Sequence, residues 1–341
     1  MAVAEQANLD RVAPALHEAL LARRLAGELP QDFLEYLGLI HAATLRQNAR
    51  VHRLVLELGE ILGAAGIPVL LLKGANRLMA AGGALGSRLL GDVDFLVAAK
   101  QEVPTLEALT HAGFRPAAAA ALYARHFHHV PLARPGDPVT IELHRHLGWQ
   151  RHLLTPAEAM AAAAPLAALP ALRLMNPAHR FIFGCLHAQL QDMTYRAGLI
   201  RLRDLLDIAE LANGEILDWQ AIAAFGEERG IQAYLAGPLH LAHRLLGLPL
   251  PGPYRGMRAA RHHARRCILQ RRIDPGQRLA RLGVKLAWLW DARRHAYERD
   301  CERSGWLRRQ GAVMLGRIEA IRGVLGRANR KRAATFAAER G

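Results

Sequence analysis

The stretch Gly91-Asp92-Val93-Asp94-Phe95-Leu96-Val97 carries the clearest structural signal in the sequence. It is short and apolar except for its two aspartates, which is typical of a buried β-strand. Successive side chains of a strand point to opposite faces, so Asp92 and Asp94 share one face and the apolar side chains share the other. The pattern therefore predicts a strand that buries one face and presents a pair of carboxylates on the other.

The run Val139-Thr140-Ile141-Glu142-Leu143-His144 repeats this pattern and predicts a second strand. If the two strands are neighbours, Glu142 converges with Asp92 and Asp94. Three converging carboxylates repel one another unless a cation neutralises them, and Mg²⁺ prefers carboxylate and phosphate oxygens. The sequence thus predicts a divalent-metal site. We expect His144, on the same face as Glu142, to orient a substrate or to support the metal ligands.

Histidines also gather in the segment before the second strand. The run His126–Leu132 is joined to that strand by Pro135-Gly136-Asp137-Pro138, a strong turn signal that predicts a hairpin. A mononuclear metal site of histidines is the alternative to a carboxylate site. We favour the carboxylates, because they already supply a hard-cation site and histidine suits softer ions.

An anion site is predicted ahead of the aspartates. Residues 67–72 form an apolar run that predicts a short strand, Lys73-Gly74 a tight turn, and residues 75–81 a helix. The free N–H groups and the positive dipole end of such a helix favour an anion. Gly74 would let a phosphate approach the backbone closely.

Three segments together resemble a known family. They are Leu71-Leu72-Lys73-Gly74-Ala75, the segment from Arg88 to Val97, and Ile141-Glu142-Leu143-His144. Over residues 30–215, roughly, the chain looks like the uncharacterised nucleotidyltransferase family of the polymerase-beta superfamily. Similar layouts occur in abortive-infection nucleotidyltransferase toxins and in aminoglycoside nucleotidyltransferases. The resemblance implies transfer of a nucleoside monophosphate from a nucleoside triphosphate (NTP) to a hydroxyl acceptor.

The resemblance also implies roles for single residues. Asp92, Asp94 and Glu142 would be the metal ligands, holding two Mg²⁺ ions (Mn²⁺ is an alternative), and Glu142 would also be the candidate general base. Gly74 and Lys73 would hold the triphosphate of the NTP.

Three further positions complete this assignment. Arg88 would either neutralise developing charge or brace its loop by pairing with an aspartate, and His144 would contact the substrate. The superfamily's wider signature has Gly-Ser or Gly-Gly at the turn, whereas Ala75 supplies no hydroxyl here.

Two helical features also follow the family. His187 and Leu205-Leu206-Asp207 match a His-rich helix followed by a Leu-Leu-Asp helix in family members. Asp207 would either face the active cleft or be a solvated or capping aspartate, and we expect the second.

The expected fold class is α+β. A small mixed-sheet nucleotidyltransferase core at 67–150 would be flanked by an N-terminal helical segment at 1–66 and a larger all-helical region at 151–341. Strand signals stop near residue 150, and Thr155-Pro156-Ala157-Glu158 and Asn176-Pro177 begin helices.

The net charge of +15 is concentrated near the C-terminus. Residues 251–341 carry 23 Lys and Arg against 7 Asp and Glu, so this quarter is either a solvated arginine-rich face or a surface for RNA or another anionic partner. Trp288, Trp290 and Trp306 there are expected in helix cores, with a membrane-surface helix or base stacking as alternatives.

The acceptor and the compartment are less determined. An RNA 3′ end or a small hydroxylated molecule would both serve as acceptor, and a catalytically inactive nucleotide-binding or partner-binding protein is the alternative function. No transmembrane segment is evident. Three widely separated cysteines suggest a reducing cytoplasm.

Overall fold

The computed structural model describes residues 2–80, 86–119, 123 and 126–286. The chain divides into two compact units, 1–276 and 277–341. The three tryptophans expected in C-terminal helices lie outside the described residues, as does most of the basic quarter. Everything below concerns the first unit.

A seven-stranded mixed sheet forms the centre of this unit, with the strand order β3-β4-β5-β2-β1-β7-β6. The strands are β1 (Val69–Leu71), β2 (Asp92–Leu96), β3 (Arg115–Pro116), β4 (Leu132–Ala133), β5 (Thr140–His144), β6 (Ala164–Leu166) and β7 (Leu169–Leu174).

The two strands that carry the carboxylates are neighbours, as the sequence predicts. β2 and β5 run parallel, and their register sets Asp94 opposite Glu142. The apolar residues Val93 and Phe95 are completely buried and pack with Ile141 of β5 in one core. The alternation therefore places the polar side chains of both strands on the other face.

β4 and β5 pair antiparallel, which confirms the hairpin, although β4 covers only two residues and a single bridge joins His128 to His144. A mixed α+β fold with one mixed sheet is thus established.

The prediction that strands end near residue 150 was wrong. β7 pairs parallel with β1, and β6 pairs antiparallel with β7 at the edge of the sheet. Pro165 and Pro170 hid these strands, because proline removes a ladder donor and is tolerated mainly at sheet edges. The region after residue 150 is therefore not all-helical.

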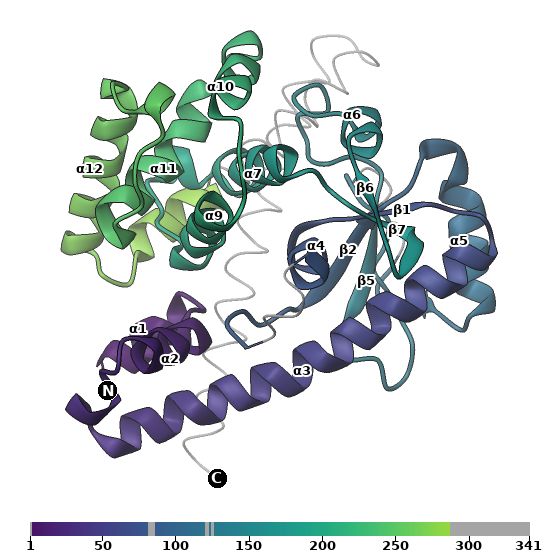
Figure 1. Cartoon of the computed structure of the whole chain (residues 1–341), viewed down its shortest axis with the longest axis horizontal. Coiled ribbons are helices and arrows are strands. Elements are labelled where there is room, and N and C mark those ends of the chain that lie inside the picture. The colour runs from purple at the N-terminus through teal and green to yellow at the C-terminus, as the bar shows by residue number, and fades with distance from the viewer. Residues whose placement is uncertain (1, 81–85, 120–122, 124–125, 287–341) are drawn as a thin grey trace, which may run out of the picture. The chain divides into compact units, whose positions relative to one another are not determined.

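Helices cover the sheet and continue beyond it (Figure 1). The N-terminal helices are α1 (Ala2–Leu9), α2 (Ala13–Ala22), η1 (Ala26–Glu28) and α3 (Gln31–Ala64), and those within the sheet region are α4 (Lys73–Ala80), η2 (Ala99–Gln101) and α5 (Glu102–His111). The later ones are α6 (Pro156–Ala161), α7 (Pro177–Leu186), the π-helix η4 (His187–Gln191), α8 (Thr194–Ala197), α9 (Leu202–Gly214), α10 (Trp219–Glu228), α11 (Gln232–Leu246), η5 (Gly252–Tyr254) and α12 (Arg258–Ile273).

The long helix α3 packs against β7 (Figure 1). A Cβ atom at Gly59 would lie 2.5 Å from Leu169 Cδ2 and 2.7 Å from Leu172 Cγ, so the absence of a side chain permits this close approach. Both predicted helix starts are confirmed. Thr155 and Glu158 form a capping box on α6, and Asn176 caps α7. Across the described residues, no helix combines the length and hydrophobicity that a bilayer span requires.

Candidate active site

Asp94 is the most enclosed acid of the site, with 1% of its surface exposed. Its Oδ1 accepts hydrogen bonds from Lys73 Nζ and His144 Nε2, each at 2.8 Å. Its Oδ2 is buried and has no hydrogen-bond partner among the described residues. Burial would raise the pKa of Asp94, but the Lys73 charge and the hydrogen bond from His144 outweigh it and hold that pKa well below its usual range. Asp94 is therefore an ionised carboxylate with one unpaired, buried oxygen.

Candidate metal-binding atoms of Asp94, Glu142 and His144 all lie within 4.8 Å of one another. A buried carboxylate oxygen without a partner, beside a second carboxylate, fits a hard divalent cation. His144 Nε2 is already hydrogen-bonded to Asp94, and its Nδ1 lies 3.2 Å from the carbonyl oxygen of His146. In this arrangement the completely buried His144 positions the carboxylate of Asp94.

Asp92 stands apart from this group, although it belongs to the same strand. No hydrogen bond or ion pair joins its side chain to another described residue. Burial and the charge of Asp94 raise the pKa of Asp92, while Lys73 and Arg88 oppose the shift. Asp92 is thus a partly exposed acid whose ionised form is incompletely compensated.

Glu142 is destabilised as an anion. Burial, followed by the charges of Asp94 and Asp92, raises its pKa to about 7. Its Oε2 lies 3.5 Å from His128 Nε2, and His128 Nδ1 lies 2.6 Å from the carbonyl oxygen of His129. A carbonyl only accepts, so Nδ1 carries the proton and Nε2 presents its lone pair to Glu142.

Burial lowers the pKa of His128 to about 4, which keeps this ring neutral at pH 7. Its contact with Glu142 was not predicted. The sequence feature that could have indicated this contact is the position of His128 in the segment that pairs with β5.

The predicted strand and helix are present as β1 and α4, but Lys73 and Gly74, expected as a separate turn, are the first two residues of α4. Lys73 begins α4 with φ of 42°, a left-handed conformation that is uncommon for a side-chain-bearing residue. A Cβ atom at Gly74 would lie 2.4 Å from Leu90 Cδ2 and 2.8 Å from Arg88 Nη1. A side chain at this position would therefore displace the ends of the Leu90 and Arg88 side chains. Ala75, where the wider signature differs, is completely buried in the core.

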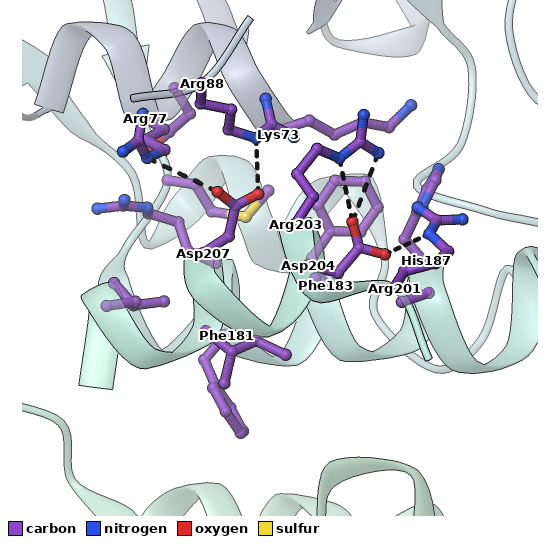
Figure 2. A pocket seen from close by; sticks show the side chains of 17 residues that line it. Lys73, Arg77, Arg88, Phe181, Phe183, His187, Arg201, Arg203, Asp204 and Asp207 are labelled. Atoms are coloured by element: carbon purple, nitrogen blue, oxygen red, sulfur yellow. Dashed lines mark hydrogen bonds and ion pairs between the residues drawn. The ribbon is translucent and has the colours of Figure 1, made fainter. Parts of the chain in front are cut away.

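Arg88 pairs with an aspartate, but that aspartate lies on α9, far along the sequence. Its Nε lies 2.8 Å from Asp207 Oδ2, and Arg77 Nε lies 3.7 Å from Asp207 Oδ1 (Figure 2). The expectation of a solvated or capping Asp207 was wrong. Asp207 lines a cavity between α4, α7 and α9, because the face of α9 that carries it is turned toward Arg77 and Arg88.

Comparison with known proteins agrees with this geometry. Residues 2–247 match the uncharacterised nucleotidyltransferase family. The chain belongs to that family. The match covers the sheet, both carboxylate strands and the helices through α11, and it implies a transferase with a nucleotide substrate. No curated protein matches the chain.

In this nucleotidyltransferase-family chain, two cavities adjoin the acids. We call the first the carboxylate cavity. It has a volume of about 580 Å³ and is lined by Gly74, Asp92 and Asp94, and by N-terminal residues that include Asn8 and Arg11. The N-terminal helices therefore form part of the wall of the candidate site.

The second, the arginine cavity, has a volume of about 130 Å³ and is the one shown in Figure 2. Lys73, Arg88, His187 and Arg203 line both cavities. Sequence reasoning did not identify Arg203, and it noted His187 only through the family, since both reach the site from helices about a hundred residues after β2.

Proposed function

We propose that this protein is a Mg²⁺-dependent nucleotidyltransferase that transfers a nucleoside monophosphate from an NTP to a hydroxyl group of an acceptor. Family membership supports the reaction class. The observation that carries the metal dependence is the buried, unpaired Oδ2 of Asp94, with Glu142 in register on the neighbouring strand. An ionised carboxylate oxygen is costly to bury without a partner, and a bound cation removes that cost.

Asp92, Asp94 and Glu142 would hold the metal, with two Mg²⁺ ions as our proposal and Mn²⁺ as a substitute. When bound, the metal would neutralise charge on the triphosphate and lower the pKa of the acceptor hydroxyl. Lys73 and His144 keep the carboxylate of Asp94 ionised and oriented. Glu142, with its pKa near 7, is suited to exchange the hydroxyl proton.

The donor triphosphate would lie in the carboxylate cavity. Gly74 at the start of α4, with Lys73 and Arg88, would bind its phosphates, since backbone N–H groups and the helix dipole favour anions there. His144 reaches the substrate only through Asp94 in this arrangement. We therefore assign it a positioning role in place of direct contact.

The test is transfer of label. The full chain is incubated with each α-labelled NTP, Mg²⁺ or Mn²⁺, and a cell extract, beside the double variant Asp92→Asn/Asp94→Asn. We expect a labelled product from the wild type and none from the variant. Nucleotide binding by both proteins without any transfer would favour the alternative, a catalytically inactive nucleotide-binding or partner-binding protein.

Several finer predictions from the sequence belong to this proposal. They are a division near residues 66 and 150, a cytoplasmic location, and contact between residues 251–341 and RNA or another anion. Salt dependence addresses the last one, because binding of an RNA acceptor weakens steeply as salt rises whereas binding of a neutral small molecule does not.

A further inference from the structure

The arginine cavity is lined by more cationic side chains than carboxylates, and most of the acids that pair with these cations lie outside its lining. It lies between α4, α7 and α9, and the carboxylates in its lining are Asp204 and Asp207. Its cationic lining residues are Lys73, Arg77, Arg88, Arg180, Arg201 and Arg203.

Each of the two aspartates is shared by two guanidinium groups (Figure 2). Asp207 lies between Arg77 and Arg88. Asp204, one turn earlier on α9, lies 2.6 Å from Arg201 Nε and 3.4 Å from Arg203 Nε. Arg77 and Arg201 have further carboxylates, Glu210 and Asp192, at the outside of the cavity. Arg203 is therefore paired only through a long contact with Asp204, which also forms a shorter ion pair with Arg201.

Arg180 is the second weakly compensated cation. Its side chain is 17% exposed, and its ion pair with Glu215 is 3.3 Å long, to an acid that is 40% exposed. Burial lowers the pKa of Arg180 and that of Arg203, against the opposing effect of nearby acids. A buried guanidinium with incomplete pairing is costly, and an anion that enters the cavity would offset this cost. Arginine forks suit phosphate in particular.

Lys73 and Arg88 are shared with the surface that the donor needs, but Arg180 is separate from it. Gly74, Asp92 and Asp94 line the carboxylate cavity, whereas Arg180 and Arg201 line only the arginine cavity. The two cavities meet at shared residues, among them Arg88 and Arg203. A phosphate in the arginine cavity would therefore belong to a second molecule close to the donor.

We propose that the arginine cavity binds a phosphate group of the acceptor, so that the acceptor is a phosphorylated compound with a free hydroxyl. The inference rests on the proposed function. In the transfer, the acceptor oxygen bonds to the α-phosphorus of the NTP and the bond from that phosphorus to the α,β-bridging oxygen breaks. Pyrophosphate leaves with the electron pair of that bond, and the hydroxyl proton passes to a base such as Glu142 or to solvent.

Binding of inorganic phosphate to the full chain tests the cavity itself, by calorimetry without nucleotide. We expect Arg180→Gln to weaken phosphate binding at least about tenfold, and Arg180→Lys, which keeps the charge but loses the planar fork, to weaken it less. The matched control is Arg115→Gln on the exposed edge strand β3, which lines neither cavity and should leave this binding within about twofold. Circular dichroism confirms that each variant is folded. Equal phosphate affinity in wild type and Arg180→Gln, or no binding up to about 10 mM, would overturn the proposal.

A second experiment addresses the acceptor. The extract is treated with a phosphomonoesterase, which is then removed, before the α-labelled NTP is added. Loss of the labelled product is expected, and undiminished product from the treated extract would contradict a phosphorylated acceptor. The calorimetric test stays informative if no transfer occurs at all, because it measures phosphate binding without nucleotide, metal or acceptor. Failure of the proposed function and failure of this inference are thus distinguishable.

Discussion

Asp94 of β2 and Glu142 of β5 are direct partners in a parallel register, and their environments drive their pKa values in opposite directions. Asp94 has Lys73 and His144 as hydrogen-bond donors and stays ionised, whereas burial and the charges of Asp94 and Asp92 raise the pKa of Glu142, which therefore tends to keep its proton. Two neighbouring acids with such different pKa values are a common arrangement at functional sites. The difference leads to predictions for each of them.

Binding of Mn²⁺ should depend on pH through Glu142. Its pKa is about 7 in the metal-free protein, so a proton must leave before the carboxylate can bind a cation. Below pH 7 the apparent Mn²⁺ affinity should fall about tenfold per pH unit, and above it the affinity should level off. Calorimetry at several pH values measures this. Glu142→Gln should bind more weakly and lose the pH dependence, and an unchanged profile in that variant would contradict the assignment.

The unfolding free energy of the metal-free protein should fall with rising pH, whereas the affinity for Mn²⁺ rises. The folded pKa of Glu142 lies above its usual value of 4.5, so the native state holds a proton that the unfolded chain has lost. Stability from this group is present below about pH 4.5 and is lost as the pH rises to about 7. Urea unfolding at low salt, with Glu142→Gln as the reference, isolates this contribution. A wild-type profile that parallels the reference would contradict the raised pKa.

Lys73 should be needed to keep the buried Asp94 charged. Lys73→Met removes one of the two side chains that donate hydrogen bonds to Asp94. The metal-free variant should therefore lose about 3 kcal/mol of unfolding free energy. Added Mg²⁺ should restore part of this loss because a cation would again face the carboxylate. The control is Lys100→Met at an exposed lysine, with an expected change within about 0.5 kcal/mol. Equal stabilities of Lys73→Met and wild type in chelator would show that Asp94 does not depend on Lys73.

Gly74 should tolerate no side chain. A methyl group there meets Leu90 and the guanidinium of Arg88, so Gly74→Ala should cost about 1–3 kcal/mol and weaken nucleotide binding by displacing Arg88. Gly252→Ala is a suitable control, because a Cβ at Gly252 meets nothing within 4 Å. Denaturant unfolding and nucleotide titration of both variants provide the measurements. Normal stability and affinity in Gly74→Ala would mean that neither neighbour constrains this turn.

The parts of the fold that could be predicted are those with local periodicity. Alternation of apolar and acidic residues identified β2 and β5, and the turn residues 135–138 identified the hairpin that ends in β5. β6 and β7 were not predicted because their prolines and alanines resemble a broken helix, and only the pairing of β7 with β1 and of β6 with β7 makes them strands. Propensity is overridden there by tertiary contacts, which sequence periodicity does not contain.

The candidate site follows the same division. Asp92, Asp94 and Glu142 could be placed on one face from strand alternation alone. Asp207 and Arg203 could not be placed, since their position depends on how α9 packs on α7 and α11, which brings it to Arg77 of α4 from more than a hundred residues away in sequence. Likewise, the link from His128 to Glu142 depends on one bridge between His128 and His144, which the hairpin pattern predicts only to within a residue or two.

The position of a bound metal would show whether the carboxylates of β2 and β5 form a cation site. Crystals of the full chain soaked in Mn²⁺ would be measured at a wavelength where manganese scatters anomalously. The account predicts an anomalous peak about 2 Å from Oδ2 of Asp94, with Asp92 or Glu142 as a second ligand, and its loss in Asp94→Asn. A well-ordered site that shows no manganese between these carboxylates, or manganese bound only elsewhere on the chain, would contradict it.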